Sequence, residues 1–416
     1  MYSEQTLKTF DTKKQRFNRA WITVALLVVV AALNYLDRTM ITTMRSSILQ
    51  EIPMTEAQFG LLSSVFLWVY GLLSPFAGFV ADKFNRSKVI IVSLIVWSGV
   101  TWLTAHASTF NELLLTRALM GISEACYVPA ALALIADYHG TKTRSLATGI
   151  HMAGIMAGQS LGFVGGWIAE EHSWNTSFTI LGIFGIVYAV LLVAILRDPA
   201  QKINEEASVK KPAVNLKEGV GIMFKDPSFI KVLIYWSLLG VVSWLVMGWL
   251  PTYYKEQFSL SQTAAGIYAT GYLYPVSLAG VIIGGLIADR WSRKNKRARI
   301  LLPVLGMLIA APFIFMATVT SILPVAIVFF MVYAFTRAFT DANMMPILCM
   351  IVDERYRATG YGILNMFSTI VGGLALYAGG ILRDAQINLS YIYQFAGVTM
   401  LICAWILYKV KPRIEG

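Results

Sequence analysis

The feature that most constrains the fold of this chain is a series of apolar stretches, each about 20 residues long, that recur from Trp21 to Tyr408. A helix of this length spans the roughly 30 Å hydrocarbon core of a membrane. The sequence of 416 residues is 57% hydrophobic and only 14% charged. A soluble protein needs more polar material than this to cover so large an apolar interior. We therefore predict an all-α integral membrane protein.

Apolar windows between polar breaks predict twelve transmembrane helices in two sets. The windows lie near residues 20–44, 57–82, 87–107, 111–138, 143–170, 175–196, 228–255, 262–289, 298–318, 322–351, 357–383 and 390–410. They predict an N-terminal bundle at 20–196 and a C-terminal bundle at 228–410, joined by a polar linker at 197–227. Residues 1–19 and 411–416 are expected to form a polar leader and a tail. Because the first apolar run carries no small-residue cleavage site, we expect the first helix to remain attached.

The formal net charge of +11 arises largely from bases that gather in alternate loops. Lys83, Arg86, Arg144, Arg290 and Arg293 belong to loops on the same predicted side of the membrane as both termini. Basic loops stay in the cytoplasm under the positive-inside rule. We therefore expect both termini and the linker to be cytoplasmic, in the inner (cell) membrane of a bacterium. This placement accounts for the charge without a nucleic-acid partner.

An internal repeat relates the two sets of helices. The segment GFVADKFNR at 78–86 returns as GLIADRWSR at 285–293, each after the second helix of its set. Thr-Arg-Ala occurs at 116–118 and 336–338, and Ala-Thr-Gly occurs near 148 and near 359. Three matches in the same order indicate duplication of a six-helix unit, the organisation from which alternating-access carriers are built.

Several of these segments resemble signatures of a known family. GFVADKFNRSK at 78–88 resembles the loop between the second and third helices of the major facilitator superfamily. NYLDR at 34–38 and RALMGISEA at 117–125 are similar to signatures shared by the anion:cation symporters and the spinster-like transporters. WLPTY at 249–253 is more similar to the seventh helix of the anion symporters. The resemblance implies the major facilitator fold, with two pseudo-symmetric six-helix bundles.

Ionisable residues inside the predicted spans are few and grouped. Asp37 and Arg38 lie in the first span, and Arg117 and Glu124 lie in the fourth. Each costs about 2.5–3.5 kcal/mol to insert at the membrane centre, so each needs a partner, a water-filled cavity or a functional role. The seven-residue spacing of Arg117 and Glu124 places them on one face of a helix. We expect Asp37 to pair with Arg117, and Glu124 to pair with Arg38.

The resemblance implies roles for these four residues. Asp37 and Glu124 would couple proton movement to transport, with Glu124 the deeper of the two. Arg38 or Arg117 would bind the substrate carboxylate, since a planar guanidinium holds a carboxylate through two hydrogen bonds. The alternative is a buried charge network that only fixes helix packing.

Further candidates for substrate binding are polar and aromatic residues in other spans. Arg337 and Asp341 are four residues apart in the tenth span, so we expect them to pair, with Arg337 also lining the cavity. The other candidates are Tyr35, Tyr127, His151, Gln159, Asn343 and Asn365. Tyr35 and Tyr127 adjoin the charged positions in sequence, whereas a packing role is the alternative for His151.

Two features are candidates for the moving parts. The resemblance implies that the repeated loop charges form a gate at the cytoplasmic helix ends, and solvated loop charges are the alternative. These gating residues are Asp82, Arg86, Asp289 and Arg293. Glycines at every fourth position from Gly154 to Gly166 offer a smooth face for another helix. In the family, the fifth and eighth helices pack across the two halves, so this face suits a rocking contact, although close packing alone would also explain it.

The predicted function is proton-coupled symport of a small organic anion, namely a sugar acid such as a uronate or aldonate, or a related carboxylate. The alternative is a spinster-like exporter of a lipid or amphiphile. No nucleotide-binding loop, metal-ligand cluster or nucleophile constellation is present, so we do not predict an enzyme. A receptor is disfavoured because no signalling domain is appended. We expect a monomer whose partners are the solute, the bilayer and a proton, with no metal or other cofactor.

Overall fold

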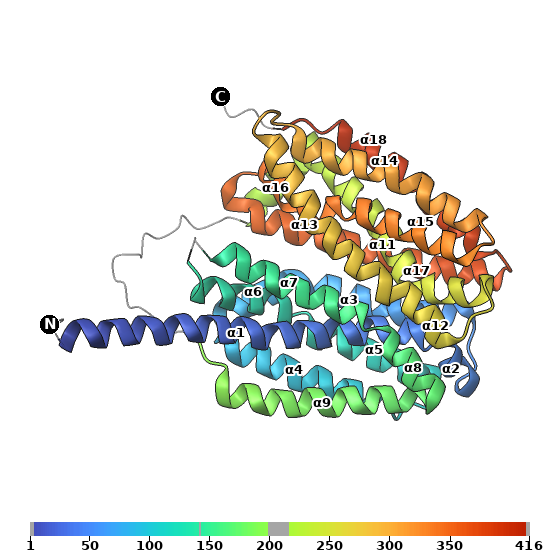
Figure 1. Ribbon diagram of the computed structural model, residues 1–416, viewed down its shortest axis with the longest axis horizontal. Coiled ribbons are helices and arrows are strands. Elements are labelled where there is room, and N and C mark those ends of the chain that lie inside the picture. Colours follow the sequence, from blue (N-terminus) through green and yellow to red (C-terminus); the bar gives the residue numbers. More distant parts are fainter. Residues whose placement is uncertain (1–3, 141–142, 199–215, 413–416) are drawn as a thin grey trace.

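The computed structural model describes residues 4–140, 143–198 and 216–412, which form helices and no strands. Within these residues, twelve helices are long and apolar enough to cross a membrane, and they agree with the predicted windows to within a few residues. The expected all-α fold with twelve spans is therefore confirmed. Figure 1 shows the spans running roughly alongside one another.

The first half of the molecule contains six of these spans. Its helices are α1 (Glu4–Thr43), α2 (Arg45–Glu51), α3 (Glu56–Lys83), α4 (Arg86–Thr104), α5 (Phe110–Glu124), α6 (Tyr127–Tyr138), α7 (Arg144–Ser160), α8 (Phe163–Glu171) and α9 (Trp174–Ile195). The fourth span is α5 with α6, and the fifth is α7 with α8. The described part of the expected leader continues helix α1, which begins at Glu4.

The second half contains the other six spans. Its elements are α11 (Pro227–Gln257), α12 (Gln262–Gly266), the π-helix η2 (Ile267–Tyr272), α13 (Leu273–Ser292), α14 (Ala298–Val319), α15 (Leu323–Arg337), α16 (Phe339–Cys349), the short η3 (Glu354–Tyr356), α17 (Arg357–Asp384) and α18 (Leu389–Tyr408). The eighth span joins α12, η2 and α13, and the tenth joins α15 and α16. Within the expected linker, residues 199–215 lie outside the described part, and the rest includes helix α10 (Leu216–Lys225).

Helix starts on the side of the bundle opposite the termini follow local sequence rules. Thr55 and Thr109 each form a capping box, with Gln58 and Glu112 at the third helical position of α3 and α5. These reciprocal hydrogen bonds satisfy backbone N–H groups that the first helical turn leaves free. We call this side, where α3 and α5 begin, the distal end, and the side where α1 begins and α18 ends, the terminal end.

The glycine stripe of the fifth span packs within the first half. A Cβ atom added to Gly154 would lie 2.8 Å from the carbonyl oxygen of Val28, and one added to Gly162 would lie 2.5 Å from Cγ2 of Thr39. Val28 and Thr39 both belong to α1, so the stripe lets α1 and α7 approach closely. The hypothesis of a rocking contact between the halves is therefore wrong for this stripe, because α1 covers it.

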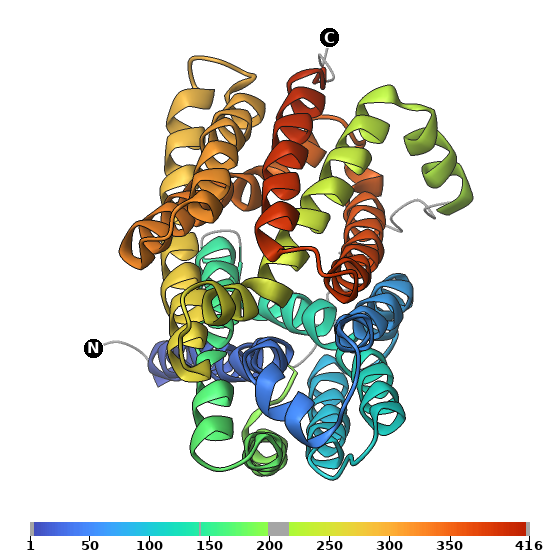
Figure 2. The same cartoon turned by 90° about the vertical axis from the view of Figure 1, so that its right-hand side faces the viewer.

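The two halves meet along α3 and α17 at the distal end. Seen from that end in Figure 2, the first half (blue to green) forms the lower group and the second half (yellow-green to red) forms the upper group. Ser64 donates a hydrogen bond to the carbonyl of Gly373 at 2.7 Å, and Trp68 donates one to the carbonyl of Ile370 at 3.1 Å. These contacts hold α3 and α17 together across the boundary between the halves.

A group of charged residues closes the distal end, and we call it the distal ion cluster. Arg383 binds both carboxylate oxygens of Glu256, at 2.9 and 2.7 Å, and lies 3.3 Å from Glu56. Glu56 also pairs with Arg45. Asp384 accepts hydrogen bonds from the backbone N–H groups of Glu56 and Ala57 at 2.8 and 3.0 Å. The cluster therefore links α2 and α3 of the first half to α11 and α17 of the second, at a helix N-terminus that favours negative charge.

The contact between the two halves ends before the terminal end is reached. A Cβ atom on Gly71 would meet Thr369 of α17 at 3.4 Å, but Pro75, one turn further along α3, is exposed. On α17, an added Cβ at Gly362 would meet no atom within 4 Å, and the same is true of Gly149 on α7. The hydrogen bonds between α3 and α17 thus lie toward the distal end, and Figure 1 shows the helices of the two halves diverging toward the terminal end.

Replacing Arg383 with glutamine is expected to loosen the distal end. The change removes the ion pairs to Glu56 and Glu256, and hydrogen bonds to charged groups contribute about 1.5–3 kcal/mol each. We expect the ratio of distally closed to distally open molecules to fall by on the order of tenfold. Distances between spin labels at Glu171 and Ala385, which are exposed in opposite halves, would measure this shift after replacement of the native cysteines.

The matched control for that experiment is Arg355→Gln. Arg355 pairs with Asp353 at 3.1 Å, but this pair is exposed and lies at the terminal end. The Arg355→Gln variant should leave the distances between the spin labels unchanged. Unaltered distances in the Arg383 variant would show that the distal ion cluster does not hold the closed state.

Candidate functional site

A cavity of about 320 Å³ lies between the two halves. Helices α1 and α7 supply its wall in the first half, and α11, α13, α15, α16 and α17 supply its wall in the second. Four of the predicted substrate-binding residues line it: Tyr35, Gln159, Arg337 and Asn365. A volume of this order is typical of small-molecule sites.

Among the residues that the structure describes, the charged side chains that line the cavity are Arg337 and Asp341. Arg337 donates from its two terminal nitrogens to the two carboxylate oxygens of Asp341, at 2.9 and 3.2 Å, and also to Ser243 at 2.8 Å. The pair bridges the break at Ala338 between α15 and α16. The expectation that Arg337 and Asp341 pair is confirmed.

A second group of charges is buried in the first half, and we call it the four-charge cluster: Asp37, Arg38, Arg117 and Glu124. Arg38 donates from Nε to Glu124 at 2.7 Å, and a terminal nitrogen of Arg117 lies 3.7 Å from Asp37. Both expected pairings are therefore confirmed. Glu124 is 0% exposed and Asp37 is 1% exposed, so these carboxylates depend on their partners for stabilisation.

Neighbouring threonines complete the surroundings of Asp37 and Arg117. Thr101 of α4 donates a hydrogen bond to the Asp37 carboxylate. Thr104, also of α4, accepts one from Arg117 at 3.4 Å. The spacing of charges along the chain did not indicate this third helix, because single threonines occur throughout membrane spans and form hydrogen bonds to their own helix.

Aromatic rings surround the guanidinium of Arg38. Its central carbon lies 4.5 Å from the ring centroids of Tyr35 and Tyr70 and 4.9 Å from that of Phe66. Cation–π attraction of this kind strengthens when the groups are removed from water. Phe66 and Tyr70 were not predicted as site residues, although their four-residue spacing places both on one face of α3.

The four-charge cluster adjoins the large cavity without lining it. Arg38 and Arg117 border a separate pocket of about 20 Å³ at the boundary between the halves. Trp244 and Met247 of α11 line both this pocket and the large cavity. Arg38 and Arg117 thus do not line the large cavity, because both arginines turn toward carboxylates of their own half.

Three other predicted substrate-binding residues lie away from the cavity. The hydroxyl of Tyr127 donates to the carbonyl of Leu27 at 2.9 Å and lies 3.0 Å from Nε2 of His151. Both rings are fully buried inside the first half. Asn343 is 1% exposed and donates to the carbonyl of Phe339 on its own helix at 2.8 Å. These side chains face the interior of their own bundles. The hydrophobic periodicity of a span does not tell a face that points into the bundle from a face that points into the cavity.

Two of the predicted gating residues, Arg86 and Asp289, form ion pairs inside their own half. Arg86 pairs with Asp137, where α4 begins near the end of α6. Asp289 accepts a hydrogen bond from Arg299 at 2.8 Å, between α13 and α14, and Arg293 is exposed. The side chain of Asp82 lies outside the described residues. Each of these two pairs joins neighbouring helices of one half.

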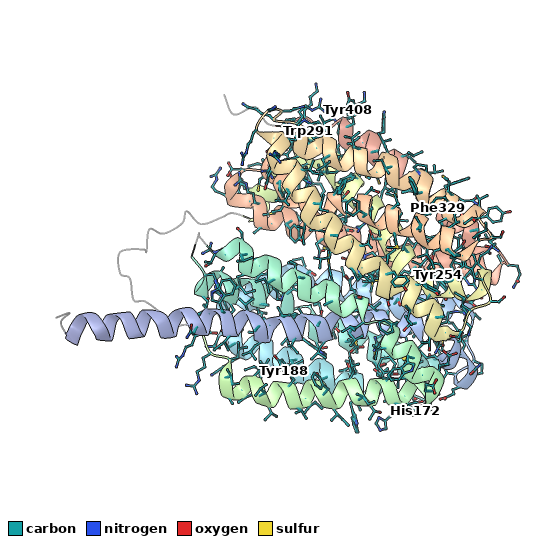
Figure 3. The ribbon with its side chains drawn as sticks, in the orientation of Figure 1. His172, Tyr188, Tyr254, Trp291, Phe329 and Tyr408 are labelled. Carbon is teal, nitrogen blue, oxygen red and sulfur yellow. The ribbon has the colours of Figure 1, made fainter. Side chains whose placement is uncertain are left out.

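Aromatic side chains also lie near both ends of the bundle. Figure 3 labels His172 at the distal end of the first half and Trp291 and Tyr408 at the terminal end of the second. Tyr408 is 49% exposed, and aromatic rings at helix ends are typical of the membrane–water interface. The placement of Trp291 and Tyr408 agrees with a membrane–water interface at the terminal end.

Comparison with known proteins agrees with this architecture. The sequence pattern described as the Major Facilitator Superfamily matches residues 27–376. The probable galactarate/D-glucarate transporter GarP of Escherichia coli (strain K12) is 23% identical over 428 residues, covering 95% of each chain. Protein spinster homolog 1 of Xenopus tropicalis is 26% identical over 409 residues, covering 92% of this chain and 77% of the relative.

A solved structure shows the same fold. It is a bacterial homolog to the human lysosomal transporter Spinster, in an inward-facing and occupied conformation. Its TM-score is 0.74 at 22% sequence identity, with 94% of each chain covered. Two bundles of membrane helices enclosing a cavity define a membrane carrier. The chain belongs to the major facilitator superfamily, a family of membrane transporters.

Proposed function

We propose that the protein is a proton-coupled symporter of a small organic anion, such as a sugar acid or a related carboxylate. The observation that carries this proposal is the buried pair of Glu124 and Arg38, which borders the boundary between the halves next to the cavity. A buried carboxylate that pairs with an arginine can change its partner when it gains a proton, because a neutral carboxyl no longer attracts the guanidinium as strongly.

In the proposed cycle, Glu124 and Asp37 carry the proton. Protonation of Glu124 weakens its 2.7 Å contact with Arg38, which is then free to turn toward the boundary between the halves. Arg337 supplies a guanidinium on the cavity wall for the solute carboxylate. The ring of Tyr35 lies against Arg38, and Tyr35 also lines the cavity. It therefore connects the four-charge cluster to the cavity.

The proposal includes an orientation. Basic loops at the terminal end favour a cytoplasmic location for both termini, in a bacterial cell membrane. The distal end would then face outward, and the present structure would be open to the cytoplasm. In this arrangement the distal ion cluster keeps the outside closed while solute and proton leave together. Arg86, Asp289 and Arg293, with Asp82, would close the cytoplasmic side in the opposite state.

The alternative is export of a lipid or amphiphile, and the apolar part of the cavity wall favours it. Met152, Met156, Trp236, Leu239 and Met247 line the cavity, and flexible methionines adapt to varied apolar ligands. Spinster relatives are also among the similar proteins. We favour the anion because the cavity wall carries Arg337 together with several hydroxyl and amide groups.

Proton movement into proteoliposomes that contain the purified protein would test the proposal. Uronates, aldonates, D-glucarate, other carboxylates, neutral sugars and lysolipids would be added in turn. We expect acids alone to drive proton uptake. Absence of proton movement with every acid, together with release of a lysolipid, would replace the symporter with the exporter.

A further inference from the structure

The Arg337–Asp341 pair already has the geometry that binding of a substrate carboxylate requires. Two parallel N–H···O contacts of 2.9 and 3.2 Å join the terminal nitrogens of the guanidinium to both oxygens of Asp341. A carboxylate solute would use the same nitrogens in the same bidentate arrangement. Asp341 therefore occupies the binding position on the cavity's cation.

The charge of the cavity wall makes this occupation important. Arg337 and Asp341 are the charged residues among those that line the cavity in the described part of the chain, so their formal charges cancel. A neutral wall gives an anion little electrostatic attraction while the pair is intact. Separation of the pair exposes a full positive charge to the cavity.

The surroundings of the pair permit such a separation. The side chains of Arg337 and Asp341 are 19% and 28% exposed, so both have free space on the cavity side. The Nε of Arg337 is buried and has no hydrogen-bond partner, which leaves one donor unused by Asp341. Tyr333 lines the same cavity, and the hydroxyl of Tyr235 is buried without a hydrogen-bond partner. A phenolic hydroxyl can donate to a displaced carboxylate.

We propose that Asp341 is a built-in competitor of the substrate: it holds Arg337 in the empty cavity, and the solute carboxylate displaces it on binding. Asp341 thereby sets both the affinity and the specificity for anions. A neutral solute cannot displace Asp341, and an anion that does so is held weakly enough to be released. This inference rests on the proposed anion transport.

Equilibrium binding of D-glucuronate to the purified full-length protein tests this inference, with D-glucose as the neutral control. Asp341→Asn should bind D-glucuronate about tenfold more tightly than the unmodified protein, because the competing charge is lost. Asp341→Glu should restore the weaker binding. Arg337→Gln should lose D-glucuronate binding, and D-glucose binding should be the same in every variant.

Asp353→Asn provides the matched control, because Asp353 pairs with Arg355 outside the cavity. It should leave D-glucuronate affinity unchanged. If Asp341→Asn binds D-glucuronate equally or more weakly, and its melting temperature falls, then Asp341 only joins α15 to α16 and the inference is overturned. Absence of binding even in Asp341→Asn would overturn it as well. Because binding is measured without a proton gradient, failure of proton coupling alone leaves this result intact and counts only against the proposed symport.

Discussion

Replacing Glu124 with glutamine is expected to reduce proton-driven uptake to background while substrate binding and exchange persist. Glutamine has nearly the same shape and can still accept a hydrogen bond from Arg38 through its carbonyl oxygen, but it cannot gain or lose a proton. Glu124 is 0% exposed and lies 2.7 Å from Arg38. The substitution therefore removes the charge of a buried group that is in direct contact with its partner. Proton flux and solute counterflow in proteoliposomes would measure the two activities separately.

The matched control is Glu112→Gln, in the same membrane span. Glu112 is the third residue of α5 and forms a capping box with Thr109, and glutamine can form the same reciprocal contact. We expect this variant to retain proton-driven uptake. Because a buried arginine left without its partner costs about 3–5 kcal/mol, the melting temperature of the Glu124 variant must also be recorded. Full proton-driven uptake by a folded Glu124→Gln protein would remove Glu124 from the coupling mechanism.

Replacing Gly158 with valine is expected to prevent the first half from folding correctly. A Cβ atom at this position would lie 2.7 Å from the Cα atom of Ala32, and also meets the Ala32 carbonyl. Backbone atoms cannot move aside as the end of a flexible side chain can, so α1 and α7 would have to separate. We expect a loss of about 3 kcal/mol or more, at the top of the range for overpacking. Yield and thermal stability of the purified protein would measure it.

Gly149→Val is the control for this steric argument. Gly149 lies on the same helix, but an added Cβ there would meet no atom within 4 Å. Both substitutions alter intrinsic helix propensity to the same extent, so their difference isolates the contact with α1. Equal stability of the two variants would show that the stripe from Gly154 to Gly166 does not require glycine for packing.

The contrast between these two glycines illustrates how packing differs from pattern. Repetition at every fourth residue correctly indicated a face suited to close approach, yet it did not identify the neighbouring helix. The structure places α1 against that face, whereas contacts between the halves use α3 with α17 and the region of Phe163 and Thr270. A helix face carries no information about its partner, because many helices of similar apolar composition could cover it.

The candidate site shows the same division. Charged residues in apolar spans are rare and costly, so Asp37, Arg38, Arg117 and Glu124 could be singled out and paired correctly from their positions alone. The rings of Phe66 and Tyr70 around Arg38 were not foreseen, because aromatic residues are ordinary components of membrane helices.

Helix number, helix positions and the ion pairs of the four-charge cluster follow from the order of amino acids, because the cost of placing polar groups in lipid acts on each span locally. The direction in which each span faces depends on the assembled bundle. Tyr127 and His151 therefore lie inside the first half, and the halves close at the distal end. These features arise from contacts between residues far apart in the chain, where side-chain shape and helix rotation select one arrangement among several that hydropathy alone would allow.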